Sequence, residues 1–291
     1  MKSSRDKILD LVVKKEFGEL EDKIGFSSNI FMVFGLPVRR YPDRIFEKKT
    51  QLCSLKVMNP NYEVPYGCYA RMNQIFIDTE VKTKSTNIID VGRSFRDYVN
   101  KLGYADGKAN KALIRQLVNY VTSVISVIPK ESNKWRFLGI QTSVAKKWDI
   151  SFDVKNPDQL MLAKGQIFLD EDYAKYIYKH SVPLDMHVIN CFNRNPLALD
   201  FYRFLAYRNN GLHKPIAFPD HLLFEQLGTE QHENKITRTR LMHILKAIQM
   251  FWPVQAKFED GYFEMSPSPP AVQHKIPSRR PITIESKSVD K

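Results

Sequence analysis

Two stretches of the chain place cationic and amide side chains on one face of a predicted helix, which is the chemistry that contacts duplex DNA. In the helix predicted over 108–123, the residues that we predict to contact DNA are Lys108, Lys111, Arg115, Gln116 and Asn119. In the helix predicted over 235–250, they are Lys235, Thr239, His243 and Lys246, with Arg238 and Arg240 on the two flanks. Arg and Lys suit phosphates and guanine edges, and Asn and Gln suit adenine edges. Neither face carries an acidic residue, whereas a merely solvated helix face usually mixes Lys with Glu.

Apolar residues on the opposite side of each helix predict how these faces are held outward. At about 100° per residue, the first helix gathers a stripe of Leu113, Ile114, Leu117, Val121 and Val124. The second helix gathers Leu241, Ile244, Leu245 and Ile248. Each stripe faces a core, so the polar residues opposite face away from it. The two flanking arginines of the second helix predict that it discriminates between sequences more than the first.

The elements around each helix occur in the same order in both halves of the chain. A helix precedes a short strand, a second helix that ends at a Leu-Gly pair, a polar turn, the long helix and then strands. The Leu-Gly pairs are Leu102-Gly103 and Leu227-Gly228, and Asp260-Gly261 predicts a tight hairpin in the second half. This is the order of a winged helix, a helix-turn-helix with a β-hairpin appended, whose second helix enters the major groove.

We therefore predict an α+β fold with two tandem winged-helix domains. The expected divisions are a charged lead-in with little to bury over 1–23, a first domain over 24–155, a second domain over 156–271 and a disordered basic tail over 272–291.

Composition agrees with a polyanionic partner. The 291 residues carry 44 Lys and Arg against 32 Asp and Glu, a formal net charge of +12, and 43% of them are hydrophobic. That mix excludes a wholly disordered chain and a small disulfide scaffold. The three cysteines form no C-x-x-C pair, no apolar run approaches the ~20 residues of a membrane span, and the first residues do not resemble a secretory signal. We expect reduced thiols and a cytoplasmic protein that does not enter a membrane.

The sequence contains no residue spacing that matches the catalytic or cofactor-binding motifs we considered. The stretch from Gly103 to Lys108 has three residues between its glycines, not the four of a phosphate loop, and Ala109 follows the lysine. The seven histidines form neither a His-x-His nor an HExxH pattern, which disfavours a metal-dependent DNA-nicking enzyme. The run Asp170-Glu171-Asp172 is better explained as the start of a helix than as a cation site. We expect no catalytic centre, no metal and no cofactor.

Several segments, taken together, resemble the plasmid-encoded RepA replication initiators. They lie in family order over about residues 24–271, and neither 1–23 nor 272–291 shares in the likeness. The segments are Val64-Pro65-Tyr66-Gly67 with Arg71, Thr79 to Ser85, Val91 to Phe95, Asn156 to Leu160, Val182 to Met186, Arg194 to Tyr202, Leu205 to Arg208 and Met265 to Pro270.

The resemblance implies a protein that binds repeated sites, called iterons, in duplex DNA at a plasmid origin and opens an adjacent AT-rich region. It also implies that the protein helps to load the host helicase with the host initiator, and that it is a candidate homodimer repressing its own gene. Two alternatives stay open: a winged-helix transcriptional repressor without a replication role, and an enzyme such as a primase or relaxase. The family has no short motif for base contacts, so the site residues above come from the helical projection.

Overall fold

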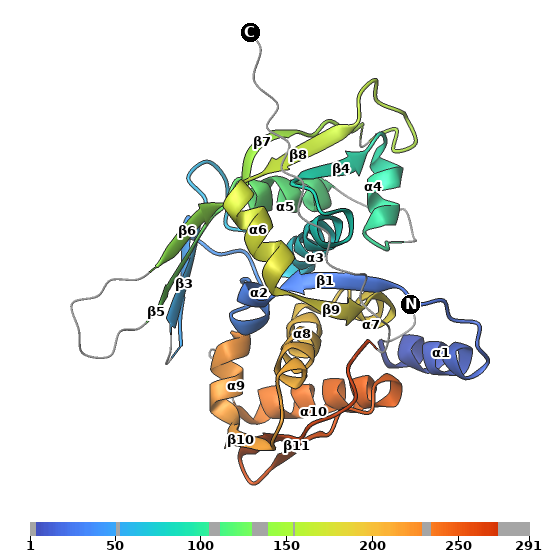
Figure 1. Ribbon diagram of the computed structural model, residues 1–291, viewed down its shortest axis with the longest axis vertical. Helices are drawn as coiled ribbons and strands as arrows, with labels where there is room; N and C mark the ends of the chain where they lie inside the picture. The colour runs from blue at the N-terminus through green and yellow to red at the C-terminus, as the bar shows by residue number, and fades with distance from the viewer. Residues whose placement is uncertain are drawn as a thin grey trace. The chain divides into compact units, whose positions relative to one another are not determined.

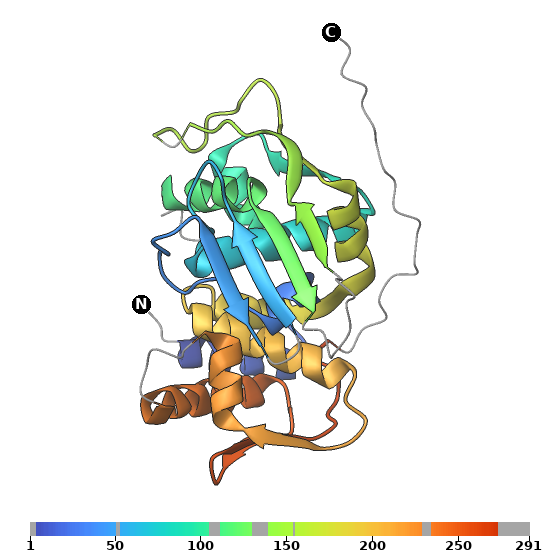
Figure 2. The same ribbon diagram turned by 90° about the vertical axis from the view of Figure 1, so that its left-hand side faces the viewer.

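The computed structural model describes residues 4–50, 53–104, 111–129, 139–153, 155–228 and 234–272. These residues fall into two compact units, which Figures 1 and 2 draw from two sides. Residues 39–181 form one, which we call the middle unit. Residues 4–38 pack with residues 182–272 to form the other, which we call the terminal unit. Both mix helix and sheet, so the predicted α+β class is confirmed.

The middle unit contains two antiparallel sheets and the helices that pack around them. Its elements are, in order, β2 (Ile45–Lys49), β3 (Cys53–Met58), α3 (Gly67–Lys84), β4 (Ile88–Gly92), α4 (Phe95–Lys101), α5 (Lys111–Val121), β5 (Val124–Pro129), β6 (Ile140–Ser143), β7 (Ala145–Asp149), β8 (Gly165–Leu169) and α6 (Glu171–His180). Strands run in the order β2-β3-β5-β6 in one sheet and β4-β8-β7 in the other. Figure 2 shows the four-stranded sheet face-on with α3 behind it. The central residues of α3 are buried from Ala70 to Asp78, which makes it the core helix of this unit.

The terminal unit repeats part of this plan. Its elements are α1 (Ser4–Glu16), β1 (Ile24–Ser28), α2 (Asn29–Val33), β9 (Ser181–Asp185), α7 (Met186–Cys191), α8 (Pro196–Asn210), β10 (Ile216–Pro219), α9 (Asp220–Leu227), α10 (Asn234–Phe251), β11 (Ala256–Glu259) and β12 (Tyr262–Met265). Strands β1 and β9 pair, and the other sheet has the order β10-β12-β11. Helix α8 is buried continuously from Ala198 to Ala206, so it is the counterpart of α3.

Local sequence signals account for where the helices begin and end. The Ser94 hydroxyl accepts a hydrogen bond from the Asp97 amide at the start of α4, and the Asn195 side chain accepts one from the Ala198 amide at the start of α8. Both predicted Leu-Gly helix ends are confirmed, with Gly103 at φ 75° and Gly228 at φ 72°. These backbone angles lie in the left-handed region that glycine adopts without steric cost.

The division of the chain differs from the expected one at its N-terminal side and at its boundary. We expected a boundary between 155 and 156, but the middle unit continues to Ser181. Residues 24–38 belong to the terminal unit because β1 pairs with β9. A pairing between segments so far apart leaves no trace in local hydrophobic periodicity. The expected tail, apart from residue 272, lies outside the described residues.

Residues 4–16 bury more than we expected of a charged lead-in. They form α1, in which Ile8 is fully buried, and this helix packs against α7 and α10. The Lys15 ammonium lies 4.4 Å from the centre of the Phe251 ring on α10. The sequence did not predict this contact, because charged residues dominate α1. Only one turn of the helix supplies a fully buried apolar side chain.

Candidate nucleic-acid interface

Helix α10 presents an exposed cationic face, as predicted. Thr239, His243 and Lys246 are exposed at a spacing of four and three residues, which puts them on one side of the helix, and Arg240 is exposed beside them. Leu241 and Ile248 on the other side are fully buried, and Leu245 is almost so. The apolar stripe therefore holds these polar side chains outward, and α10 contains no acidic residue.

Arg238, which we predicted on one flank of this face, is only partly exposed and lies close to an acidic residue. Its Nε lies 3.7 Å from Oδ2 of Asp220, the first residue of α9, and its side chain is 30% exposed. The pair fastens the first turns of α10 to the start of α9. Lys108 and the side chain of Lys235 lie outside what the structure describes.

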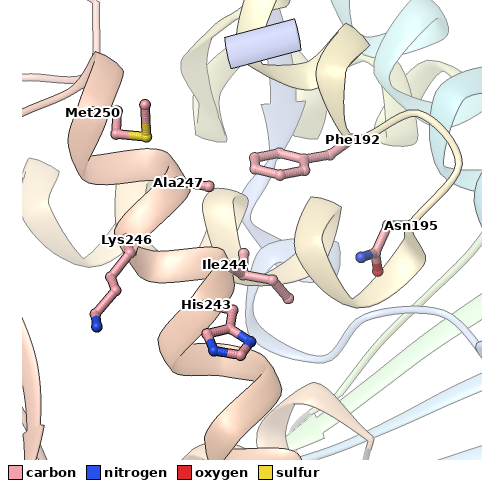
Figure 3. Close-up of a pocket in the computed structure, with 7 residues that line it drawn as sticks. All are labelled: Phe192, Asn195, His243, Ile244, Lys246, Ala247 and Met250. Carbon is pink, nitrogen blue, oxygen red and sulfur yellow. The ribbon is translucent and has the colours of Figure 1, made fainter. Parts of the chain in front are cut away.

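A hollow of about 660 Å³ adjoins the exposed face of α10. Figure 3 shows His243 and Lys246 on α10 beside it, with Phe192 and Asn195 contributed by the segment between α7 and α8. The remaining lining residues are apolar: Ile244, Ala247 and Met250. The Lys246 ammonium and the His243 ring therefore lie next to a mainly apolar surface. The predicted elements placed residues 192–195 at helix ends only, so no sequence signal brought them to α10.

Helix α5 presents fewer polar groups than we predicted. Lys111 and Arg115 are exposed, but Gln116 is 2% exposed and Asn119 is 1% exposed. The prediction that Gln116 and Asn119 lie on the outward face of this helix is therefore wrong. What remains outward on the described part of α5 is cationic, which suits phosphates more than base edges.

The error has a physical cause in the packing of α5. Its buried side is centred on Leu113, Leu117 and Tyr120, because the Tyr120 hydroxyl meets the Tyr173 hydroxyl at 2.5 Å inside the unit. The helix is thereby turned so that Gln116 faces the core. A projection that counts only aliphatic residues omits the tyrosine and places the stripe too far toward Ile114.

Gln116 holds the start of α3. Its Oε1 accepts a hydrogen bond of 2.8 Å from the backbone amide of Tyr66, the residue before α3. The buried Asn59 side chain similarly donates to the Asn119 carbonyl at 2.8 Å. Gln116 through its side chain and Asn119 through its backbone carbonyl thus belong to the interior hydrogen-bond network of the middle unit.

Replacing Gln116 with alanine is expected to lower the free energy of unfolding by about 1–3 kcal/mol, because it leaves the part-buried Tyr66 amide without this acceptor. DNA affinity of the folded protein should not change. The neighbouring substitution Arg115→Ala should do the reverse, weakening DNA binding while stability changes by less than about 0.5 kcal/mol. Denaturant titration and duplex titration of both variants measure the two effects. A loss of DNA affinity in folded Gln116→Ala would show instead that Gln116 belongs to the DNA interface.

Groups suited to metal binding do not assemble in the described part of the chain. No cluster of three or more His, Cys, Asp or Glu side chains there could hold a metal ion. Burial raises the pKa of Cys191 to about 11, so its thiol is a poor nucleophile. Asp170 caps α6 by accepting hydrogen bonds from the amides of Asp172 and Tyr173, which confirms its predicted place at a helix start. None of the described helices is long and apolar enough to cross a membrane.

Comparison with known proteins gives both a family and a fold. A family model described as plasmid-encoded RepA protein matches residues 64–216, more than half of the chain. The crystal structure of selenomethionine derivatives of domains 2 and 3 of RctB has a TM-score of 0.54 at 8% identity, covering 82% of this chain and 96% of that one. A second structure of RctB domains 2–3 has a TM-score of 0.50 at 9% identity, with the same coverage. At such identities the likeness is one of fold. No curated protein sequence matches significantly.

Proposed function

Because the chain belongs to the family of plasmid-encoded RepA proteins, we propose that it is a replication initiator that binds repeated sites in duplex DNA at a plasmid origin. The observation that carries this proposal is the exposed, acid-free face of α10, with Thr239, Arg240, His243 and Lys246 side by side. These are side chains that bind phosphates and read base edges in the major groove.

The strand order supports a winged-helix arrangement in each unit. In the terminal unit, α8, β10, α9, α10 and the hairpin β11–β12 follow one another, and β10 pairs with β12. In the middle unit, α3, β4, α4 and α5 are followed by β7 and β8, and β4 pairs with β8. On this proposal, α10 and α5 are the recognition helices of the two units. The middle unit departs from a minimal winged helix because β5 and β6 intervene and join a separate sheet.

The two units differ in what their recognition helices offer to DNA. Helix α10 has an arginine, a histidine and a threonine among its exposed groups, whereas the described part of α5 offers Lys111 and Arg115. We propose that the terminal unit supplies most of the sequence discrimination and that the middle unit mainly anchors on phosphates. Base-edge contacts specify a sequence, whereas phosphate contacts position the protein.

The further steps of the proposal follow from binding alone and need no catalytic group, metal or cofactor on this chain. Binding of several copies to adjacent iterons strains the duplex and favours opening of an AT-rich segment, where the host initiator and helicase assemble. A homodimer on its own promoter is the proposed repressor form. A plasmid that carries only this gene and its flanking repeats distinguishes an initiator, which maintains the plasmid, from a repressor, which does not.

DNA affinity is expected to fall steeply with salt, because phosphate contacts release condensed counterions. An interface that neutralises about 6–10 phosphates loses about 10³–10⁵ in affinity between 50 and 200 mM salt. Fluorescence-anisotropy titration of the full chain across this range measures the slope. Lys111→Ala should make the slope shallower, and a nearly flat response of the wild-type chain would contradict cationic contact through α5 and α10.

A further inference from the structure

The loop between β7 and β8 carries two leucines whose side chains are exposed to solvent. Its residues are 150–164, of which all but residue 154 are described. The Leu160 side chain is 70% exposed and Leu162 is 105% exposed. Single exposed leucines are common on protein surfaces, but two neighbouring ones on a held loop form a small apolar projection.

Hydrogen bonds to the start of α4 hold this loop in place. The Arg96 guanidinium donates to both oxygens of Asp158, with Nε to Oδ1 at 2.8 Å and Nη2 to Oδ2 at 3.1 Å. The Arg96 amide donates to the Pro157 carbonyl, and the Met161 amide donates to the Arg93 carbonyl at 2.8 Å. The Asp158 pKa is lowered by its hydrogen bond to Arg96, so the pair stays charged at neutral pH. The backbone is thus fixed on both sides of Leu160.

The loop is held against α4, and the proposed role of that helix brings the loop close to DNA. Figure 1 shows the yellow-green loop extending from β7 and β8 to α4. In the proposed function, α4 is the first helix of the helix-turn-helix, which crosses the DNA backbone while the next helix enters the major groove. A projection fastened to Arg93 and Arg96 therefore lies within reach of the bound duplex.

The charged residues on and beside the loop are compatible with an approach of the loop to DNA phosphates. Asp153 accepts hydrogen bonds from the amides of Lys155 and Asn156, and Asp158 is occupied by Arg96. Two of the loop's carboxylates are therefore engaged in holding its backbone. Arg93 and Lys155 are exposed beside them and are available to approach phosphates.

We propose that Leu160 and Leu162 form a wedge that enters the minor groove next to the site bound by the middle unit and unstacks a base step. Minor-groove proteins insert Leu, Ile, Met, Phe or Pro side chains in this way, and they kink the duplex by about 20–90°. Pyrimidine–purine steps such as TA deform most easily, so an AT-rich neighbour favours the insertion. The wedge rests on the proposed function and adds to it the element that deforms DNA.

The experiment uses the full-length chain and a duplex that this chain selects from a random-sequence pool. Single 2-aminopurine substitutions along the duplex report unstacking by a rise in fluorescence, and end-to-end energy transfer reports bending. The double variant Leu160→Ala/Leu162→Ala should bind within about threefold of wild type, yet lose the fluorescence rise and most of the bend. Leu160→Met/Leu162→Met should restore both signals, because methionine also serves as a wedge.

Two further variants separate the wedge from other effects of mutation. Leu9→Ala/Val13→Ala removes another exposed apolar pair, 42% and 50% exposed, from α1 of the terminal unit and should change neither signal. Arg96→Gln keeps both leucines but releases Asp158, so it should reduce unstacking as a positioning residue would.

The outcomes distinguish the wedge from the function on which it rests. A wild-type chain that binds no duplex overturns both proposals. Bound DNA that is straight and fully stacked, or an alanine double variant that unstacks and bends it as wild type does, overturns the wedge alone. If the leucine substitutions leave DNA deformation intact but abolish binding to a purified host replication protein, the loop is a protein-docking element and the wedge is wrong.

Discussion

Replacing Arg240 with alanine should reduce the preference of the protein for its own site over scrambled duplex by about 1–3 kcal/mol, or roughly five- to 150-fold. The expected reason is the loss of a planar guanidinium that can bind both acceptors of a guanine edge. Arg240 is exposed on α10, next to His243 in the helical turn, and the buried stripe of that helix is untouched by the change. The circular dichroism spectrum should therefore stay unchanged.

Arg238 provides the matched comparison because it is an arginine on the same helix with a different environment. Its guanidinium is paired with Asp220, so Arg238→Ala should act mainly on the junction between α9 and α10. We expect a small loss of stability, of the order of the 0–1 kcal/mol of a surface ion pair. Competition titrations with specific and scrambled duplex, run on both variants, separate discrimination from general affinity.

Arg39→Ala controls for the loss of one positive charge, since Arg39 is exposed and lies on neither recognition helix. It should lower binding to specific and scrambled duplex by similar, small factors. If Arg240→Ala behaves like Arg39→Ala and keeps full preference for its site, α10 is not the reading helix. A loss of preference in Arg238→Ala alone would shift the reading face to the opposite flank of α10.

Local patterns predicted most of the secondary structure around both recognition helices. The repeated order of helix, strand, helix, helix and hairpin was visible because each element has its own periodic or turn signal. Asp260-Gly261 does form the hairpin between β11 and β12, with φ of 45° and 81°, as a tight turn with two positive φ angles requires. Asp185 caps α7 in the same local manner, by accepting a hydrogen bond from the His187 amide.

The pairing of distant segments could not be read from the same patterns. The pairing of β1 with β9 assigns residues 24–38 to the terminal unit, and nothing within either strand specifies its partner. Burial of Ile8 against the rest of the terminal unit is equally non-local. Such contacts depend on tertiary packing, whereas turn and cap signals depend on neighbouring residues.

Within the candidate interface, the aliphatic stripe was a better guide for α10 than for α5. In α10, aliphatic residues supply most of the buried side, so the projection placed Thr239, His243 and Lys246 correctly on the exposed side. In α5, the buried Tyr120 also belongs to the buried side, and the helix is turned so that Gln116 faces the interior. The exposure of the leucines in the β7–β8 loop was not predicted, because a loop has no periodicity that separates exposed from buried apolar residues.

Truncating Phe263 should have the largest effect on stability, because its ring joins the elements that support α10. Phe263 is fully buried on β12, the central strand of its sheet, and its ring centre lies 6.0 Å from Phe201 and 6.2 Å from Phe204 on α8. It also lies 5.6 Å from Phe218 on β10 and 5.0 Å from Phe258 on β11. One side chain therefore couples the core helix to all three strands.

Phe263→Ala should lower the free energy of unfolding of the terminal unit by about 3–5 kcal/mol, the cost of a large cavity in an aromatic core. Since whole domains are stable by only about 5–15 kcal/mol, much of the unit's stability would be lost. Denaturant unfolding followed by the fluorescence of Trp252, which is buried in this unit, reports the change when Trp135 and Trp148 are replaced with Phe.

Phe258→Ala is the matched control for this effect, because Phe258 belongs to the same ring cluster but is only half-buried on an edge strand. Its removal should cost clearly less than the removal of Phe263. DNA discrimination should fall with Phe263→Ala under conditions where the variant is still mostly folded, since the support of α10 is loosened. Equal losses from the two substitutions, or a loss below about 1 kcal/mol from Phe263→Ala, would show that this cluster does not hold the hairpin and the recognition helix together.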